Sequence, residues 1–256
     1  MLPKRLALFD MDGTLCTSRQ PVPDEMKDLL RRLSAEGVGV AVVTGSDIAK
    51  VQEQFGDGWD TILDVVFAEN GTQVFSAGEL LASMDMLQHM GEERTQELIN
   101  HALKYMANLK LPRKRGTFVE FRRGMINFCP PGRSIDQQGR EDFVVMDKKE
   151  NIRDKMIESL RASFGNQGWT IAKGGQISLD CYPDKWDKRF CLNYISTAKH
   201  SAPMDIITCD SIDFFGDRTT AGGNDYELYS DSRVTGHSVA TWIDTVELCT
   251  QMYIEK

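Results

Sequence analysis

Two aspartates one residue apart, Asp10 and Asp12, stand at the head of the run 10–14, directly after the short apolar stretch 6–9. In parallel α/β sheets, ligands bind beyond the carboxyl ends of the strands. Alternation along an extended chain points both carboxylates the same way, where they repel unless a cation or a proton joins them. Magnesium prefers such oxygens and keeps several waters. The pattern predicts a magnesium-bound carboxylate pair, and an ordinary Asp-x-Asp-Gly turn is the alternative.

Complementary residues follow other apolar stretches. Ser46 comes after the stretch 38–43, where a hydroxyl and the N–H groups of the next helix suit a phosphate oxygen, although a helix cap is the alternative. Lys188 would neutralise phosphate charge unless it is an ordinary solvated lysine. Asp217 ends a late strand and offers a third carboxylate for the metal, and the Gly-rich turn 222–225 adds another acid. Together these residues predict phosphoryl transfer with Asp10 as a covalent nucleophile.

The elements that carry these residues alternate between strand and helix patterns. Strands are predicted at 6–9, 38–43, 65–68 and 212–215, with Val239 in a last short strand, and helices at 24–36, 47–55, 188–194 and 242–252. This order predicts a parallel sheet covered by helices.

The middle of the chain has a different pattern. Helices are predicted at 92–109 and 151–164, and antiparallel hairpins at 116–128, around Arg123-Gly124, and 169–182, around Gly174-Gly175. The fold class is therefore an α/β core with an inserted α+β module. We expect core segments at 1–82 and 187–256 and the insertion at 83–186.

Composition narrows the function classes. The chain has 256 residues, 41% of them hydrophobic, and a net charge of -8, which disfavours nucleic-acid binding. Six scattered cysteines without a CxxC pair indicate reduced thiols. Without a signal peptide or an apolar run that could span a bilayer, the chain is expected to be cytoplasmic and to have no membrane partner.

The strand-end residues, in this order, resemble the haloacid dehalogenase (HAD) superfamily of aspartyl phosphotransferases. The resemblance implies that Asp10 attacks phosphorus and that Asp12 is the general acid and base. It also implies that Mg²⁺ is held by Asp10, Asp217 and the backbone oxygen of Asp12.

A closer resemblance covers almost the whole chain. The segments 67–71, 115–122, 127–134, 147–150, 174–180, 186–189, 222–225 and 236–239, with Gly-Gly-Gln-Ile-Ser-Leu-Asp at 174–180 and Trp-Asp-Lys-Arg at 186–189, are similar to the eukaryotic-type phosphomannomutases. That family implies a cap inserted in a HAD core, Mg²⁺, and interconversion of mannose 6-phosphate and mannose 1-phosphate. It further implies a mannose or glucose 1,6-bisphosphate activator, a homodimer formed through the caps, and supply of mannose 1-phosphate for GDP-mannose and glycosylation.

The family pattern also assigns residues. Substrate-binding positions match Arg19, Arg122, Arg133, Arg140, Ser178 and Asp180, phosphate-site positions match Ser46 and Lys188, and a second cation loop matches Tyr229, Asp231 and Val234. Val234 stands where the family usually has Thr, which is harmless if the ligand is the backbone oxygen. Four arginines exceed what one phosphate needs, so they favour a substrate with two anionic groups, with solvated charges as the alternative.

Three alternatives remain open at this level. The chain could be a HAD-type sugar-phosphate phosphatase, could act on glucose phosphates as a phosphoglucomutase, or could bind sugar phosphates without catalysis. The residues Leu103, Met106, Leu109 and Phe118 could face a partner cap, but periodicity alone favours packing within their own module.

Overall fold

The computed structural model describes residues 5–255, which form two compact units. The core unit combines Met1–Ser83 with Trp186–Lys256, and the inserted unit is Met84–Lys185. The predicted fold class, an α/β core interrupted by an α+β insertion, is confirmed.

The core unit is built on a seven-stranded sheet with the order β13-β12-β1-β2-β3-β4-β5. These strands are β1 (Arg5–Phe9), β2 (Val38–Val43), β3 (Val65–Ala68), β4 (Gln73–Ser76), β5 (Glu79–Ser83), β12 (Ser211–Gly216) and β13 (Thr235–Ser238). The first five in the sheet order are parallel, and Phe9 aligns with Val42 on one side and Phe215 on the other. The carboxyl ends of β1, β2 and β12 therefore meet at one edge, where the predicted chemistry lies.

The β4–β5 hairpin was not predicted, since 79–83 has no clear strand pattern. Its turn places Ala77 and Gly78 at φ values of 48° and 79°. Such a turn needs positive φ at both central residues, and Asn-Gly is a recognised sequence signal for it whereas Ala-Gly is not.

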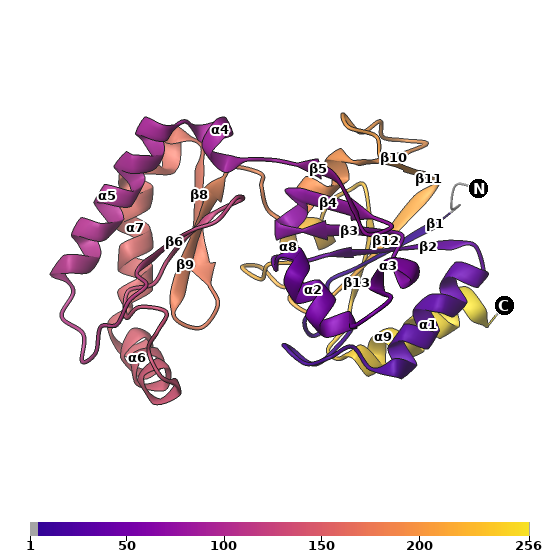
Figure 1. Cartoon of the computed structure of the whole chain (residues 1–256), viewed down its shortest axis with the longest axis horizontal. Helices are drawn as coiled ribbons and strands as arrows, with labels where there is room; N and C mark the ends of the chain where they lie inside the picture. The colour runs from indigo at the N-terminus through magenta and orange to yellow at the C-terminus, as the bar shows by residue number, and fades with distance from the viewer. Residues whose placement is uncertain (1–4, 256) are drawn as a thin grey trace. The chain divides into compact units, whose positions relative to one another are not determined.

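Helices cover both faces of this sheet. They are α1 (Asp24–Ala35), α2 (Ile48–Phe55), α3 (Trp59–Ile62), α8 (Tyr226–Tyr229) and α9 (Trp242–Cys249), with the short helices η1 (Glu69–Gly71), η3 (Lys188–Asn193) and η4 (Thr250–Ile254). Helix α1 buries Met26, Leu29, Leu30 and Leu33 as its periodicity predicts, and α9 lies beside it (Figure 1).

Four details differ from prediction. The helix expected at 188–194 is a short 3-10 helix, and the last helix changes to π geometry at Thr250. Val239 lies just beyond β13, and its N–H donates to the oxygen of Gly216 at 3.0 Å. A small parallel sheet of β10 (Ile195–Thr197) and β11 (Ile207–Cys209) was not predicted.

A polar cluster around the buried Asp213 joins both ends of the core unit. Asp213 on β12 accepts hydrogen bonds from Arg5 (2.7 Å), the hydroxyl of Tyr253 (2.9 Å) and Nε2 of His237 (3.1 Å). Burial by itself would raise the pKa of the Asp213 carboxyl, but these hydrogen bonds outweigh it and hold the pKa below its usual value. The cluster ties β1, β13 and η4 to β12, which ends at the site.

The inserted unit has an antiparallel sheet with the order β6-β7-β9-β8. Its strands are β6 (Val119–Phe121), β7 (Ile126–Phe128), β8 (Trp169–Gly174) and β9 (Ser178–Pro183), and its helices are α4 (Met86–Met90), α5 (Glu92–Asn108), α6 (Gln137–Glu150) and α7 (Ile152–Phe164). Both predicted hairpins are present, and α5 packs beside α7, which covers β8 (Figure 1).

Helix α6 was not predicted because its sequence argues against a helix. It contains Gly139 and buries Asp147, so its apolar stripe is thin. A Cβ on Gly139 would lie 2.5 Å from Cγ1 of Ile135, so close packing explains the glycine.

No helix between residues 5 and 255 has the length and apolar character required to cross a bilayer.

Candidate active site

Asp10 is the first residue beyond β1, and only 4% of it is exposed. Its N–H donates to the oxygen of Phe215 at 2.9 Å, which continues the parallel pairing with β12. The ammonium of Lys188 donates to Oδ1, and the hydroxyl of Thr14 lies 3.4 Å from Oδ2. Asp10 is therefore a buried carboxylate that the backbone and one cation hold in place.

Lys188 is 1% exposed, so it is not a solvated lysine. Besides Asp10 it contacts Oδ1 of Asp225 at 2.5 Å. Asp187 caps the short helix that Lys188 begins, through the N–H of Arg189. Burial would lower the pKa of Lys188, but the Asp10 and Asp225 carboxylates raise it above its usual value. Lys188 is a fixed ammonium between two acids that lie 178 and 37 residues away along the chain.

Asp10, Asp217 and Asp225 form a carboxylate cluster in which each offers an oxygen within 4.8 Å of the others. Burial raises the pKa of Asp10 to about 7. The charge of Lys188 lowers this pKa, and the charge of Asp225 raises it again in part. Burial and the Asp225 charge also raise the pKa of Asp217. Three carboxylates against one ammonium leave excess negative charge, which a divalent cation would balance. The donor set fits Mg²⁺.

Gly13 shows how tightly this cluster is packed. Its φ is +98°, and a Cβ at this position would lie 2.4 Å from Oδ2 of Asp217. Similarly, a Cβ on Gly216 would lie 2.8 Å from Oδ2 of Asp225. Gly13 and Gly216 leave room for the carboxylates of Asp217 and Asp225. Glycine is therefore required here for space as well as for turn formation.

Asp225 is a site residue that the sequence reasoning noted only as another acid. It is fully buried, and Oδ2 accepts from the N–H of Arg218 at 3.0 Å. The available signal was the position of the turn 222–225 just after a strand ending in Asp217.

Asp12 lies outside this side-chain cluster among the described residues. Its Oδ1 accepts from the N–H of Arg19 at 2.7 Å and from Nε2 of Gln54 at 3.1 Å. Gln54 lies on the buried face of α2 and was not predicted as a partner, although a glutamine on an apolar helix face is a detectable signal. Arg19 itself is exposed and has a φ of 64°.

Ser46 lies in the turn between β2 and α2. Its N–H donates to Oγ1 of Thr44 at 3.1 Å, and its carbonyl accepts from Glu69 at 2.9 Å. Asp47 caps α2 by accepting from the N–H of Lys50. The helix-cap interpretation of Ser46 is therefore wrong, since the next residue has that role.

The predicted second cation loop carries an internal ion pair. Asp231 accepts from Nε and Nη2 of Arg233 at 2.8 and 2.7 Å, and these hydrogen bonds lower the pKa of the Asp231 carboxyl. The N–H of Val234 donates to the oxygen of Asp231 at 3.1 Å, and Tyr229 ends α8. A cation held by the Asp231 side chain would have to compete with Arg233.

The predicted substrate residues of the inserted unit form one connected network. Asn127 lies within hydrogen-bond distance of Ser178, Asp180 and Arg133, and Arg140 donates to the carbonyl of Arg133 at 2.8 Å.

Two members of this network were missed. Glu120 accepts from Nε of Arg122 at 2.9 Å and forms an ion pair with Nε of Arg133 at 3.3 Å. Asn127 is the other, and its signal was a lone polar residue in the apolar run 125–129. The polar set thus contains its own acceptors for the arginines.

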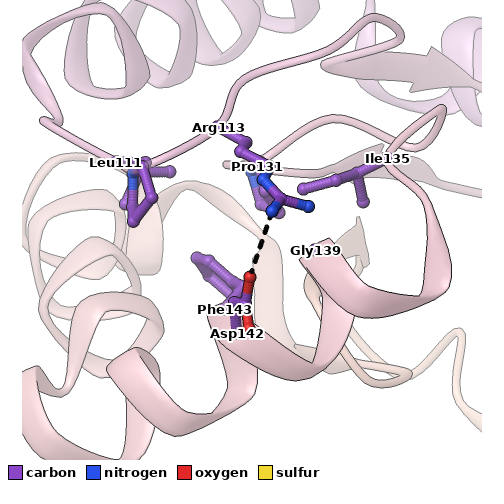
Figure 2. Close-up of a pocket in the computed structure, with 8 residues that line it drawn as sticks. Leu111, Arg113, Pro131, Ile135, Gly139, Asp142 and Phe143 are labelled. Carbon is purple, nitrogen blue, oxygen red and sulfur yellow. Dashed lines mark ion pairs between the residues drawn. The ribbon is translucent and has the colours of Figure 1, made fainter.

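A small cavity elsewhere in the inserted unit is lined mainly by apolar residues. Figure 2 shows Leu111, Ile135 and Phe143 around it, with an Arg113–Asp142 ion pair of 3.7 Å. Its volume of about 10 Å³ is close to that of one water molecule. It is too small for a sugar phosphate.

Solved structures share this fold over nearly the whole chain. A HAD subclass IIB sugar phosphatase has a TM-score of 0.54 at 15% identity, covering 96% of this chain and 91% of that chain. The C-terminal domain of trehalose-6-phosphate phosphatase from C. albicans has a TM-score of 0.61 at 15% identity, covering 97% and 92%. The protein therefore has the fold of the HAD superfamily.

Sequence comparisons define the family within that class. The profile of eukaryotic phosphomannomutase matches residues 26–255. Phosphomannomutase 1 of Homo sapiens is 46% identical over 250 residues, covering 97% of this chain and 92% of that protein. A phosphomannomutase of Triticum aestivum is 43% identical over 251 residues, covering 98% and 96%. The chain belongs to the eukaryotic phosphomannomutase family, as the resemblance predicted.

Proposed function

We propose that this protein is a magnesium-dependent phosphomannomutase that interconverts mannose 6-phosphate and mannose 1-phosphate. The observation that carries the proposal is the buried Asp10, held by Lys188 and grouped with Asp217 and Asp225, in a chain of this family. Hexose 1,6-bisphosphate, of mannose or glucose, is the proposed activator. Phosphoglucomutase activity is proposed as an additional activity.

Asp10, Asp217 and Asp225, with the backbone oxygen of Asp12, would hold Mg²⁺. The bound ion would neutralise charge on the transferring phosphoryl group. We keep Tyr229, Asp231 and Val234 as a proposed second cation loop, in which backbone oxygens are better candidates than the carboxylate paired with Arg233.

In the first half-reaction, an oxygen of the Asp10 carboxylate attacks phosphorus of the bisphosphate, and the bond from phosphorus to the sugar oxygen breaks. Asp12 gives its proton to that oxygen, and Lys188 stabilises the charge on the phosphoryl oxygens. In the second half-reaction, the free hydroxyl of an incoming mannose monophosphate attacks the phosphorus on Asp10, the bond from phosphorus to the Asp10 oxygen breaks, and a 1,6-bisphosphate forms that can react again from its other end. Asp12 then takes the hydroxyl proton, and the Asp10 carboxylate is restored.

The hydrogen bonds at Asp12 support this role. Arg19 and Gln54 both donate to Oδ1, which leaves Oδ2 to carry the proton. A proton on Oδ1 would conflict with two donors, so the arrangement favours one carboxyl oxygen for proton transfer.

The inserted unit is the proposed cap. We assign Arg122, Arg133 and Arg140 to the phosphate that is not reacting, Ser178 and Asp180 to sugar hydroxyls, and Ser46 and Arg19 to phosphate contacts from the core unit. Closing off water would protect the aspartyl phosphate from hydrolysis.

We further propose a homodimer formed through the caps and a cytoplasmic location. Leu103 on α5 is 41% exposed, which supports a partner surface, whereas Met106 is buried within its own unit. The six cysteines are free and buried, in keeping with a reducing compartment. Supply of mannose 1-phosphate for GDP-mannose and glycosylation follows from the proposed reaction. A monomer at micromolar concentration in sedimentation would contradict the dimer.

Phosphorus NMR distinguishes mutase from phosphatase. With Mg²⁺ and bisphosphate, mannose 1-phosphate should convert to mannose 6-phosphate with little inorganic phosphate. Release of inorganic phosphate without isomer exchange would instead indicate a sugar-phosphate phosphatase, and binding without either product a non-catalytic protein. Running the assay with glucose 1-phosphate measures the sugar preference.

The variant Asp10→Asn tests the nucleophile. It should lose turnover while still binding sugar phosphate, because the amide cannot form the phosphoenzyme. The exposed Asp28 forms an ion pair with Arg31 on the surface of α1 and offers the control variant Asp28→Asn with unchanged turnover. Comparable turnover in Asp10→Asn would contradict the assignment.

A further inference from the structure

Asn127 is a buried amide at the centre of the polar network in the inserted unit, with 3% of it exposed. Its Nδ2 donates to Oδ1 of Asp180 at 2.6 Å, to Oγ of Ser178 at 3.0 Å and, more weakly, to the carbonyl of Leu179 at 3.4 Å. Its Oδ1 accepts from Nη1 of Arg133 at 2.9 Å. One side chain therefore contacts three residues of the proposed substrate set.

The strand register explains this position. Asn127 on β7 is directly opposite Glu120 on β6 and Asp180 on β9. Directly opposed residues lie on the same face of an antiparallel sheet, so the three side chains form one row. The guanidinium groups of Arg122 and Arg133 contact Glu120 at one end of this row.

The chemistry of the partners fixes the orientation of the amide. Arginine can only donate hydrogen bonds, and an ionised carboxylate can only accept them. The oxygen of Asn127 must therefore face Arg133 and its NH₂ group must face Asp180. A carboxylate of the same shape could satisfy Arg133 but would repel Asp180, and an apolar side chain would satisfy neither.

The position of Asp180 is limited from its other side as well. A Cβ on Gly174 would lie 2.5 Å from Oδ2 of Asp180, so only glycine leaves room for the carboxylate there. Burial raises the pKa of Asp180, and the Asn127 hydrogen bond and the charges of Arg122 and Arg133 counteract that rise. Asn127 thus favours the ionised form while it separates the carboxylate from the arginine.

We propose that Asn127 is a positioning residue that links the phosphate-binding Arg133 to the sugar-binding Ser178 and Asp180 and keeps Arg133 and Asp180 from pairing directly. This inference rests on the proposed function. Asn127 need not touch the substrate. It sets the distance between the group that binds a phosphate and the groups that bind sugar hydroxyls, and so contributes to recognition of a phosphorylated hexose.

The test is Asn127→Asp, assayed for KM and kcat with mannose 1-phosphate and saturating bisphosphate. KM should rise roughly tenfold or more with a smaller change in kcat, because the hydrogen bond to the charged Asp180 is lost and replaced by repulsion at the recognition face and not at Asp10. The rise should also depend on pH. At lower pH the introduced carboxyl and Asp180 can share a proton and KM should recover, whereas at higher pH both are ionised and KM should worsen.

The wild-type enzyme should lack this pH-dependent change in KM, because its residue 127 is an amide that does not ionise. The titratable or polar groups around positions 127 and 180 are the same in both proteins: Glu120, Arg122, Arg133 and Ser178. A KM equal to that of the wild type at every pH, or a loss confined to kcat, would overturn the inference. Absence of mutase activity in the wild type would instead overturn the proposed function.

If Asn127→Asp does not fold, Gly174→Ala tests the same geometry, since its Cβ displaces the Asp180 carboxylate from the other side. It should raise KM without the new pH dependence. Gly165→Ala is the matched control, because its Cβ meets only Cβ of Arg161 at 3.7 Å. Unchanged KM in Gly174→Ala, with the carboxylate displaced, would refute the role of this face in sugar binding.

Discussion

Replacement of Lys188 by methionine should destabilise the core unit as well as abolish turnover. The Lys188 ammonium contacts Asp10 and Asp225, and the side chains of all three are at most 5% exposed. Methionine fills a similar volume, so the main change is the loss of the cation that two buried carboxylates share. Removing one partner of a buried ion pair costs about 3–5 kcal/mol, because it leaves an uncompensated charge.

That free energy corresponds to a measurable change in unfolding temperature. For chains of this size, 1 kcal/mol shifts Tm by about 2–4 °C, so Lys188→Met should unfold about 6–20 °C below the wild type in metal-free buffer at pH 7. Excess Mg²⁺ should reduce the difference, because the ion binds the same carboxylates and replaces part of the lost charge compensation.

Lys50→Met is the matched control. Lys50 pairs with the exposed Glu53 at 2.9 Å, and such surface pairs contribute about 0–1 kcal/mol. Thermal unfolding followed by circular dichroism, with EDTA and with Mg²⁺, measures both variants. A Tm for Lys188→Met as close to the wild type as that of Lys50→Met in EDTA would refute the buried ion-pair argument.

Three further predictions concern other parts of the molecule. Gly13→Ala should weaken Mg²⁺-dependent activity far more than Gly37→Ala, since both glycines have positive φ but only a Cβ on Gly13 would meet Asp217. Titration of activity with Mg²⁺ measures the effect, and equal metal dependence in the two variants would contradict the prediction. Asp213→Asn should lower the free energy of unfolding at pH 7. Because the folded state lowers the pKa of Asp213, the extra stability of the wild type should be present above about pH 4 and disappear as the pH falls through the folded pKa. Denaturant unfolding from pH 7 to pH 2 measures the difference, and a difference that does not change with pH would contradict this prediction. Arg153→Met should lower the free energy of unfolding by about 3 kcal/mol, because Nε of Arg153 pairs with the buried Asp147 carboxylate at 2.8 Å. Urea unfolding measures this loss, and a loss no greater than that expected for a surface ion pair would contradict the prediction.

Local patterns account for much of the fold. The all-apolar run 38–43 is completely buried as β2, and the spacing of four apolar residues in 24–36 identified the buried face of α1. Helix α6 and the β4–β5 hairpin were missed because their reasons are tertiary. Gly139 packs against Ile135, and Ala77 takes a left-handed conformation that its side chain does not favour.

The candidate site likewise has residues that the sequence indicated and contacts that only the tertiary structure shows. Strand-end positions pointed to Asp10 and Asp217, because parallel strands bring their carboxyl ends to one edge, and Lys188 was singled out at the start of the first helix after the insertion. Which acids share the ammonium was decided by packing. Asp225 reaches Lys188 from 37 residues away and completes the carboxylate cluster, and no spacing rule connects the two positions.

The sequence by itself determined the pair Asp10 and Asp12, the insertion between two core segments, and the family. Only the tertiary structure decided how these residues are supported: Gln54 holds Asp12, Glu120 holds two arginines, and Asn127 separates Arg133 from Asp180. The physical reason is the range of the interactions. Periodicity and turn chemistry act over a few residues, whereas a buried donor finds its acceptor wherever the fold brings one within about 3 Å.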